Sequence, residues 1–192
     1  MNKSKIGSAS IFTALFAALT CAGCFISIPL PGGVPVVLQD MMAMLTGLLL
    51  GPVYGTAAVF VFLIIGCLGL PVFSGKAGLH VITQGVTGGF LVGYLVSAFV
   101  GGLFLWLLLN PKKEHGKAKQ WILVSIAALL ATVVVFAMGI AGFMRITHKA
   151  FSATLGAVLT PFIPGNILKL VVMIPLTVKF RPVLARYMGF CE

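Results

Sequence analysis

The stretch 121–144, WILVSIAALLATVVVFAMGIAGFM, runs for 24 residues without a charged side chain. About 20 apolar residues are enough to cross the hydrocarbon core of a bilayer as an α-helix. The whole chain of 192 residues is 60% hydrophobic and only 8% charged, which is more apolar surface than a water-soluble domain of this size buries. The sequence therefore predicts an all-α integral membrane protein.

Similar apolar runs on both sides of this stretch predict about six transmembrane helices, in a single domain covering residues 1–192. Turns rich in Gly and Pro, or in polar residues, separate them. The fourth run is longer than a bilayer requires, so we expect it to be tilted, kinked or broken near 85–93. The segment 145–160 is less regular and is expected to dip into the membrane. The predicted spans are 8–28, 36–50, 53–70, 80–109, 121–144 and 165–178.

The basic residues, which give a net charge of +10, lie between the apolar runs and form no amphipathic face for nucleic acid. Three of the thirteen fall at one set of helix ends: Lys76, Arg145 and Lys149. Nine fall at the other set: Lys3, Lys5, Lys112, Lys113, Lys117, Lys119, Lys179, Arg181 and Arg186. By the positive-inside rule the richer side is cytoplasmic, so we expect a multi-pass protein of the cell membrane with both termini in the cytoplasm.

Lys169 is the remaining basic residue, and it lies inside the last predicted span, in PFIPGNILKLVV (161–172). At 1.5 Å per residue it is roughly 6 Å below Gly165, in the outer half of the membrane. Such a lysine either snorkels to the interface or faces a partner or a wet cavity. Asn166 shares its helix face and is expected to cap the helix. Lysine, amide and helix terminus together predict an outward-facing carboxylate site.

Asp40 is the one acidic residue that can approach Lys169, because Glu114 and Glu192 fall in segments predicted to be cytoplasmic. Asp40 is either the resting counter-ion of Lys169 or an interfacial carboxylate reached by water. Gln39 beside it points to a different face and is a candidate for hydrogen bonding to a ligand.

Three further patterns each allow two interpretations. The glycine-rich run GVTGGFLVGY (85–94) lacks the Gly-Lys-Ser/Thr of a phosphate loop, so close helix packing is the better interpretation. Cys21 and Cys24 form a C-x-x-C pair inside an apolar helix. A zinc site needs more ligands than this, so small residues in a helix are the better interpretation. A stripe of small residues in the first span predicts either internal packing or a docking face for another membrane subunit. It consists of Ala14, Ala18 and Ala22.

Five stretches, taken in order along the chain, resemble the BioY family, the biotin-specific S component of energy-coupling factor (ECF) transporters. They are IPLPGGVPVVLQ (28–39), GLLLGPVYG (47–55), GLPVFSGKAGL (69–79), GVTGGFLVGY (85–94) and PFIPGNILK (161–169). The resemblance implies the S-component fold, capture of biotin from outside, and delivery inward with a T component and two ATPases. It implies no cofactor, since only the partner subunits would use ATP. It also implies that the alanine stripe contacts the T component.

The substrate-binding pattern PGD-x-x-K of the family falls on Asn166 and Lys169, with Asn in place of Asp. Losing that carboxylate would leave Lys169 freer to attract the carboxylate of biotin. Asp40 stands where a neutral residue is expected after Leu38-Gln39. The remaining ligand contacts implied are Gln39, Thr83 and Gln84 for the ureido group, and Phe73 and Tyr94 covering the ring.

The nearest alternative function is an S component for a different vitamin. A membrane enzyme is disfavoured because the sequence has neither paired carboxylates nor a nucleophile–base motif. A passive channel would give linear flux and no tight complex.

Overall fold

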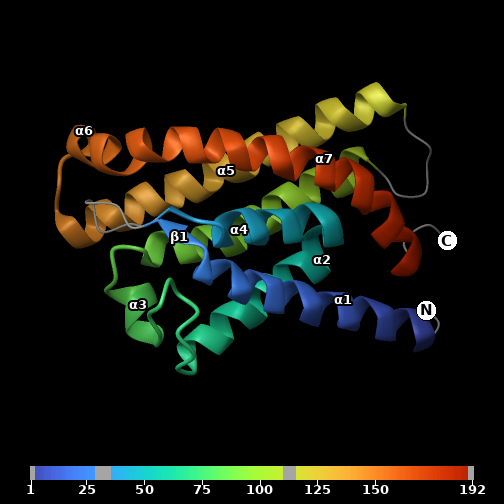
Figure 1. The fold of residues 1–192 in the computed structure, drawn as a ribbon, viewed down its shortest axis with the longest axis horizontal. Coiled ribbons are helices and arrows are strands. Elements are labelled where there is room, and N and C mark those ends of the chain that lie inside the picture. The colour runs from blue at the N-terminus through green and yellow to red at the C-terminus, as the bar shows by residue number, and fades with distance from the viewer. Residues whose placement is uncertain (1–2, 29–35, 110–115, 190–192) are drawn as a thin grey trace.

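The computed structural model describes residues 3–28, 36–109 and 116–189, which form a bundle of long helices (Figure 1). The long helices are α1 (Lys3–Ala22), α2 (Gln39–Cys67), α4 (Gly88–Leu108), α5 (Lys117–Thr147) and α7 (Ile163–Tyr187). The short elements are η1 (Gly23–Phe25), β1 (Ser27–Ile28), β2 (Val36–Val37), α3 (Leu79–Thr83), α6 (Phe151–Thr154), η2 (Leu155–Leu159) and η3 (Thr160–Phe162).

Among the residues that the structure describes, four helical segments are long and apolar enough to cross a membrane: Gly7–Phe25, Gln39–Cys67, Gly88–Leu108 and Lys117–Thr147. The helix that carries Lys169, α7, packs beside them against α2 and α5. The predicted class, an all-α membrane protein, is confirmed over the described residues, where the only strands are the two-residue pair β1 and β2.

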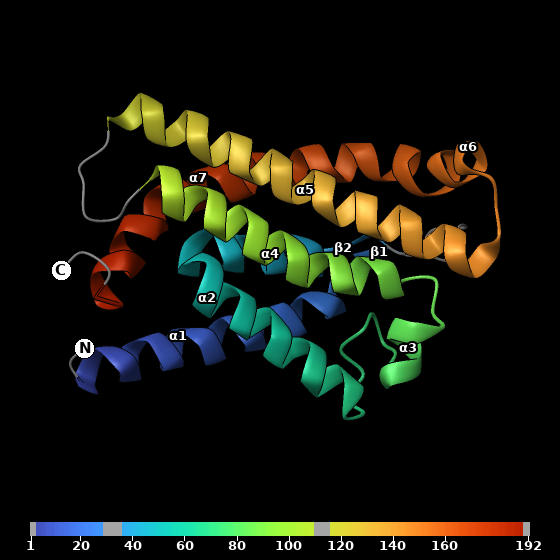
Figure 2. The ribbon, with the colours of Figure 1, turned by 180° about the vertical axis from the view of Figure 1, so that it is seen from behind.

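Helix α2 is two helical segments that meet at a sharp bend. Gly51 has φ 78° and ψ −175°, a conformation that glycine adopts readily, and Pro52 follows it. The chain therefore turns back at the dipeptide predicted to end the second span (Figures 1 and 2). A Cβ on Gly55 would lie 2.7 Å from the Cα of Gly47, so only glycines allow this approach. With its two segments counted separately, the described bundle has the six predicted helices.

The glycine-rich run 85–94 packs helices together, as predicted. A Cβ on Gly89 of α4 would lie 2.8 Å from the Cα of Gly142 in α5. A Cβ on Gly102, further along α4, would lie 2.7 Å from the carbonyl oxygen of Gly47. Helix α4 is thereby held closely between α2 and α5.

The described members of the two groups of basic residues lie at opposite ends of the bundle. Helix α1 begins, α5 begins and α7 ends at one end, whereas β1, α3 and α6 lie at the other (Figures 1 and 2). Lys117 and Arg186 belong to the first end, and Arg145 and Lys149 to the second. The charge asymmetry behind the predicted orientation is thus an asymmetry between the two ends of the molecule.

Several predicted boundaries differ from the structure. The α-helix of the first span ends at Ala22 and a 3-10 turn continues it to Phe25, before residues 27–28 pair as a strand with residues 36–37. The fourth predicted span is broken: α3 ends at Thr83 and α4 begins at Gly88. The segment 145–160 is irregular, as expected, and passes through a π-helical turn. Three predicted features lie outside the described residues: the break at 29–35, the loop residues 110–115 with Glu114, and Glu192.

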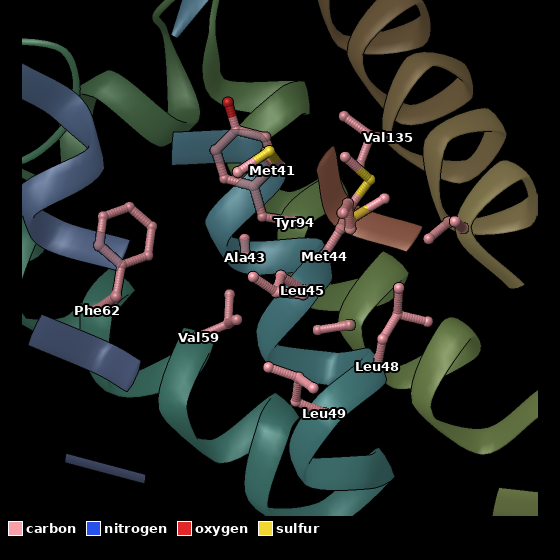
Figure 3. Close-up of a cluster of buried hydrophobic side chains, with 14 of the residues drawn as sticks. Met41, Ala43, Met44, Leu45, Leu48, Leu49, Val59, Phe62, Tyr94 and Val135 are labelled. Atoms are coloured by element: carbon pink, nitrogen blue, oxygen red, sulfur yellow. The ribbon is translucent and has the colours of Figure 1, made fainter. Parts of the chain in front are cut away.

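The first half of α2 forms the middle of the core. Its side chains interdigitate with Tyr94 of α4 and Val135 of α5, and Phe62 packs further along (Figure 3). Met44, Leu48 and Leu50 are among the most completely buried side chains. Because Gln39 and Asp40 open this buried segment, their polar groups are buried as well.

Candidate ligand-binding site

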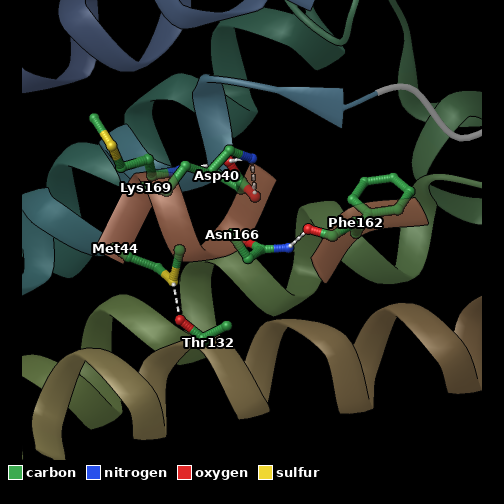
Figure 4. A network of polar contacts seen from close by, with 7 residues as sticks. Asp40, Met44, Thr132, Phe162, Asn166 and Lys169 are labelled. Carbon is green, nitrogen blue, oxygen red and sulfur yellow. Dashed lines mark hydrogen bonds and ion pairs between the residues drawn. The ribbon is translucent and has the colours of Figure 1, made fainter. Parts of the chain in front are cut away.

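A buried ion pair joins α7 to α2 near the end of the bundle that carries the strands. The Nζ atom of Lys169 lies 2.7 Å from Oδ1 and 2.8 Å from Oδ2 of Asp40 (Figure 4). The two residues are only 7% and 5% exposed. A lone buried charge is costly, and each of these charges compensates the other. The counter-ion interpretation of Asp40 is therefore confirmed, and outward snorkelling of Lys169 is wrong for this structure.

A small cavity lies beside this pair, with aromatic walls and a few polar groups. It has about 20 Å³ of free volume, which is space for roughly one water molecule. Its lining is Val37, Gln39, Asp40, Phe73, Ser74, Thr87, Phe90, Leu91, Tyr94, Val135, Phe136 and Phe162. Mostly apolar walls with a few convergent polar groups are typical of small-molecule sites. Asp40 faces the cavity and Lys169 does not line it, so the amine lies behind the carboxylate.

Three predicted ligand contacts are brought to this cavity: Phe73, Tyr94 and Gln39. Phe73 stacks edge-on against Phe62, with ring centroids 5.5 Å apart, which fixes the ring at the cavity wall. The Nε2 atom of Gln39 donates to the carbonyl oxygens of Thr20, at 3.2 Å, and Val72, at 2.7 Å. Both amide hydrogens thus hold α1 and the loop 71–78 in place, and the Gln39 oxygen is the atom left for a ligand.

Thr83 and Gln84, the other predicted ureido contacts, are exposed and do not line the cavity. The reason is the break after α3, which places these two residues on a separate short helix and its end. Ser74 and Thr87 supply hydroxyls at the cavity instead. Both lie in stretches already singled out, 69–79 and 85–94, but their position depends on how the loops fold back onto the bundle.

Asn166 does not cap a helix, contrary to the prediction. The turns before it run directly into α7, which begins at Ile163, so no free helix end exists at Asn166. Its Nδ2 atom donates to the carbonyl oxygen of Phe162 at 2.8 Å, along the helix (Figure 4). Asn166 lines a separate apolar groove of about 670 Å³ between α5 and α7. The expectation of a freer Lys169 is also wrong, because Asp40 supplies a carboxylate from another helix.

The alanine stripe of α1 faces outward. Ala14, Ala18 and Ala22 are exposed, whereas Ala17 and Thr20 on the opposite face are buried against the bundle. Within the described residues the internal-packing interpretation is therefore wrong. The docking interpretation stays a prediction.

Replacing Gln39 by methionine is expected to lower the free energy of unfolding by about 1–3 kcal/mol, because two buried carbonyls lose their donor. Gln84→Met, at an exposed amide, is the matched control and should change it little. Thermal unfolding of the detergent-solubilised variants measures both. Equal changes of the unfolding temperature in Gln39→Met and Gln84→Met would mean that the two Gln39 hydrogen bonds add no stability.

Comparison with known proteins matches the BioY family over residues 1–186. The biotin transporter BioY of Thermotoga maritima is 35% identical over 167 residues, which are 87% of this chain and 92% of that protein. The biotin transporter BioY of Rhodobacter capsulatus is 36% identical over 170 residues, covering 82% and 85%. The crystal structure of the S-component for biotin from an ECF-type ABC transporter aligns with a TM-score of 0.83 at 28% identity, covering 94% of each chain. Since the match spans nearly the whole sequence, the chain belongs to the BioY family.

Proposed function

We propose that the chain is the biotin-binding membrane subunit, the S component, of an ECF-type vitamin uptake transporter, built as a single membrane domain. The observation that carries this proposal is its likeness, over 94% of both chains, to a solved S component for biotin. The cavity supports it independently, because an ion pair and a few hydroxyls among aromatic walls suit a small acid with an apolar body.

Biotin has an apolar bicycle and tail, a ureido group and one carboxylate. Its carboxylate would pair with Lys169, and Phe73 and Tyr94 would cover the ring. The ureido group would bond to the hydroxyls of Ser74 and Thr87. A cavity of about 20 Å³ is far too small for this ligand, so the empty site must widen on binding. The loop residues from Ser74 onward are the element to move, because they lie beyond the Val72 carbonyl that Gln39 holds and the Phe73 ring that Phe62 fixes.

Transport would draw its energy from partner subunits, a T component and two ATPases. The chain itself binds and delivers, and it carries out no catalysis. The end of the bundle with fewer basic residues would face outward, which places the cavity at the outer side and both termini in the cytoplasm. The exposed alanine stripe of α1 would be the contact with the T component.

The test of the proposal is ligand-induced stabilisation of the purified protein. Biotin at 100 times its dissociation constant should stabilise the folded state by about 2.7 kcal/mol and raise the unfolding temperature. Thiamine, riboflavin and folate at the same concentration should leave it unchanged. Stabilisation by one of these vitamins and none by biotin would instead assign the chain to a different vitamin.

A further inference from the structure

We infer that capture of a carboxylate ligand at this site takes up one proton from solution, with Asp40 as the group that accepts it. The inference rests on the proposed function and extends it, because it makes biotin binding pH-dependent. It follows from the charges that surround the cavity and from the position of Asp40 between the cavity and Lys169.

The first step is the charge of the empty site. Lys169 and Asp40 together are neutral, and both are buried. Of the other elements packed around Asp40, α4 contributes the titratable Tyr94, which is neutral near pH 7. The cavity residues from α5 are apolar, Val135 and Phe136. A ligand carboxylate would therefore give this buried site a net negative charge among the described residues.

The second step is geometric. Both carboxylate oxygens of Asp40 contact the Lys169 amine, at 2.7 and 2.8 Å, and Asp40 faces the cavity. An incoming carboxylate meets Asp40 before it meets Lys169. Two carboxylates that share one ammonium out of contact with water do not both stay ionised, because like charges at this distance raise each other's proton affinity.

The third step is the balance of the exchange. A proton from bulk solution forms an O–H bond on Asp40, the contact between Asp40 and Lys169 breaks, and the ligand carboxylate takes its place. No other covalent bond changes, and the site is again neutral. Protonated Asp40 keeps a hydrogen-bond donor toward the cavity, so its oxygen atoms do not lose all their partners.

The number of protons taken up on binding is measured by titration calorimetry of the purified chain with biotin, in two buffers of different ionisation enthalpy at the same pH. The difference in heat should correspond to about one proton per biotin, and the affinity should fall by about tenfold per pH unit above neutrality. Biotin amide, which has the same rings and no carboxylate, is the control ligand. It should bind with equal heats in the two buffers and with an affinity that does not depend on pH.

Asp40→Asn should abolish the proton uptake while biotin still binds. Lys76→Gln, which removes an exposed lysine on the loop 71–78, should leave the uptake intact. Equal heats and pH-independent binding of biotin by the unaltered chain would overturn the inference and leave the proposed function standing. Loss of affinity in Lys76→Gln would then identify that lysine as the compensating cation. Failure of both biotin and its amide to bind would overturn the proposed function itself.

Discussion

Replacing Lys169 by glutamine is expected to weaken biotin binding by more than about tenfold, equivalent to roughly 1.4 kcal/mol or more. In the described part of the chain, Lys169 is the cation paired with Asp40, and no other cation lines the cavity. Its loss therefore leaves a ligand carboxylate there without an opposite charge beside it. The same change leaves Asp40 buried and unpaired. Removing one partner of a buried ion pair typically costs about 3–5 kcal/mol of stability.

A three-variant series separates the effect on binding from the effect on folding. Lys169→Gln and Asp40→Asn each break the ion pair. The double variant, which carries both substitutions, replaces the pair with two neutral amides of similar size. The double variant should recover most of the stability lost in Lys169→Gln but none of its affinity. Asp40→Asn should keep its affinity, because the amine is then free for the ligand. Thermal unfolding and titration with biotin measure the two quantities on the same samples. Full biotin affinity in a folded Lys169→Gln protein would exclude this lysine from the site.

The ion pair could be predicted from sequence because the charges are so few. Glu114 and Glu192 lie in predicted cytoplasmic segments, so Asp40 is the only acid that can approach Lys169. Asp40 and Lys169 each fall in the outer half of their predicted spans. The bend at Gly51–Pro52 was predictable for a local reason, since glycine permits the positive φ and proline ends the preceding helix.

The features that could not be predicted depend on contacts between distant segments. The predicted first span includes residues 27–28, which in the structure pair as a strand with residues 36–37. Pro164 and Gly165 indicated a helix start at Asn166, yet the preceding turns continue into α7 and the proline fits its first turn. Ser74 and Thr87 reach the cavity only because their loops fold back onto the bundle. No local pattern in the sequence contains that information.

Replacing Ala18 by tryptophan is expected to reduce partner-dependent biotin uptake by at least about tenfold while biotin binding to the isolated chain is unchanged. Small side chains let helices approach closely, and a tryptophan in the middle of the stripe would hold a partner helix away. The substitution is compatible with the fold, because Ala18 is exposed whereas its neighbour Ala17 is buried.

The control for this prediction is Ala141→Trp, the same change at an exposed alanine of α5, another membrane-spanning helix. Uptake of radiolabelled biotin is measured in cells that make the chain together with a T component and two ATPases, and binding is measured on the purified variants. Loss of uptake in Ala18→Trp alone assigns docking to the exposed face of α1. Unchanged uptake in Ala18→Trp, or an equal loss in Ala141→Trp, would contradict that assignment. The carbonyl oxygen of Thr20, on the buried face of the same helix, accepts a hydrogen bond from Gln39 beside the cavity. Docking on the outer face would therefore place the partner one helix away from the ligand.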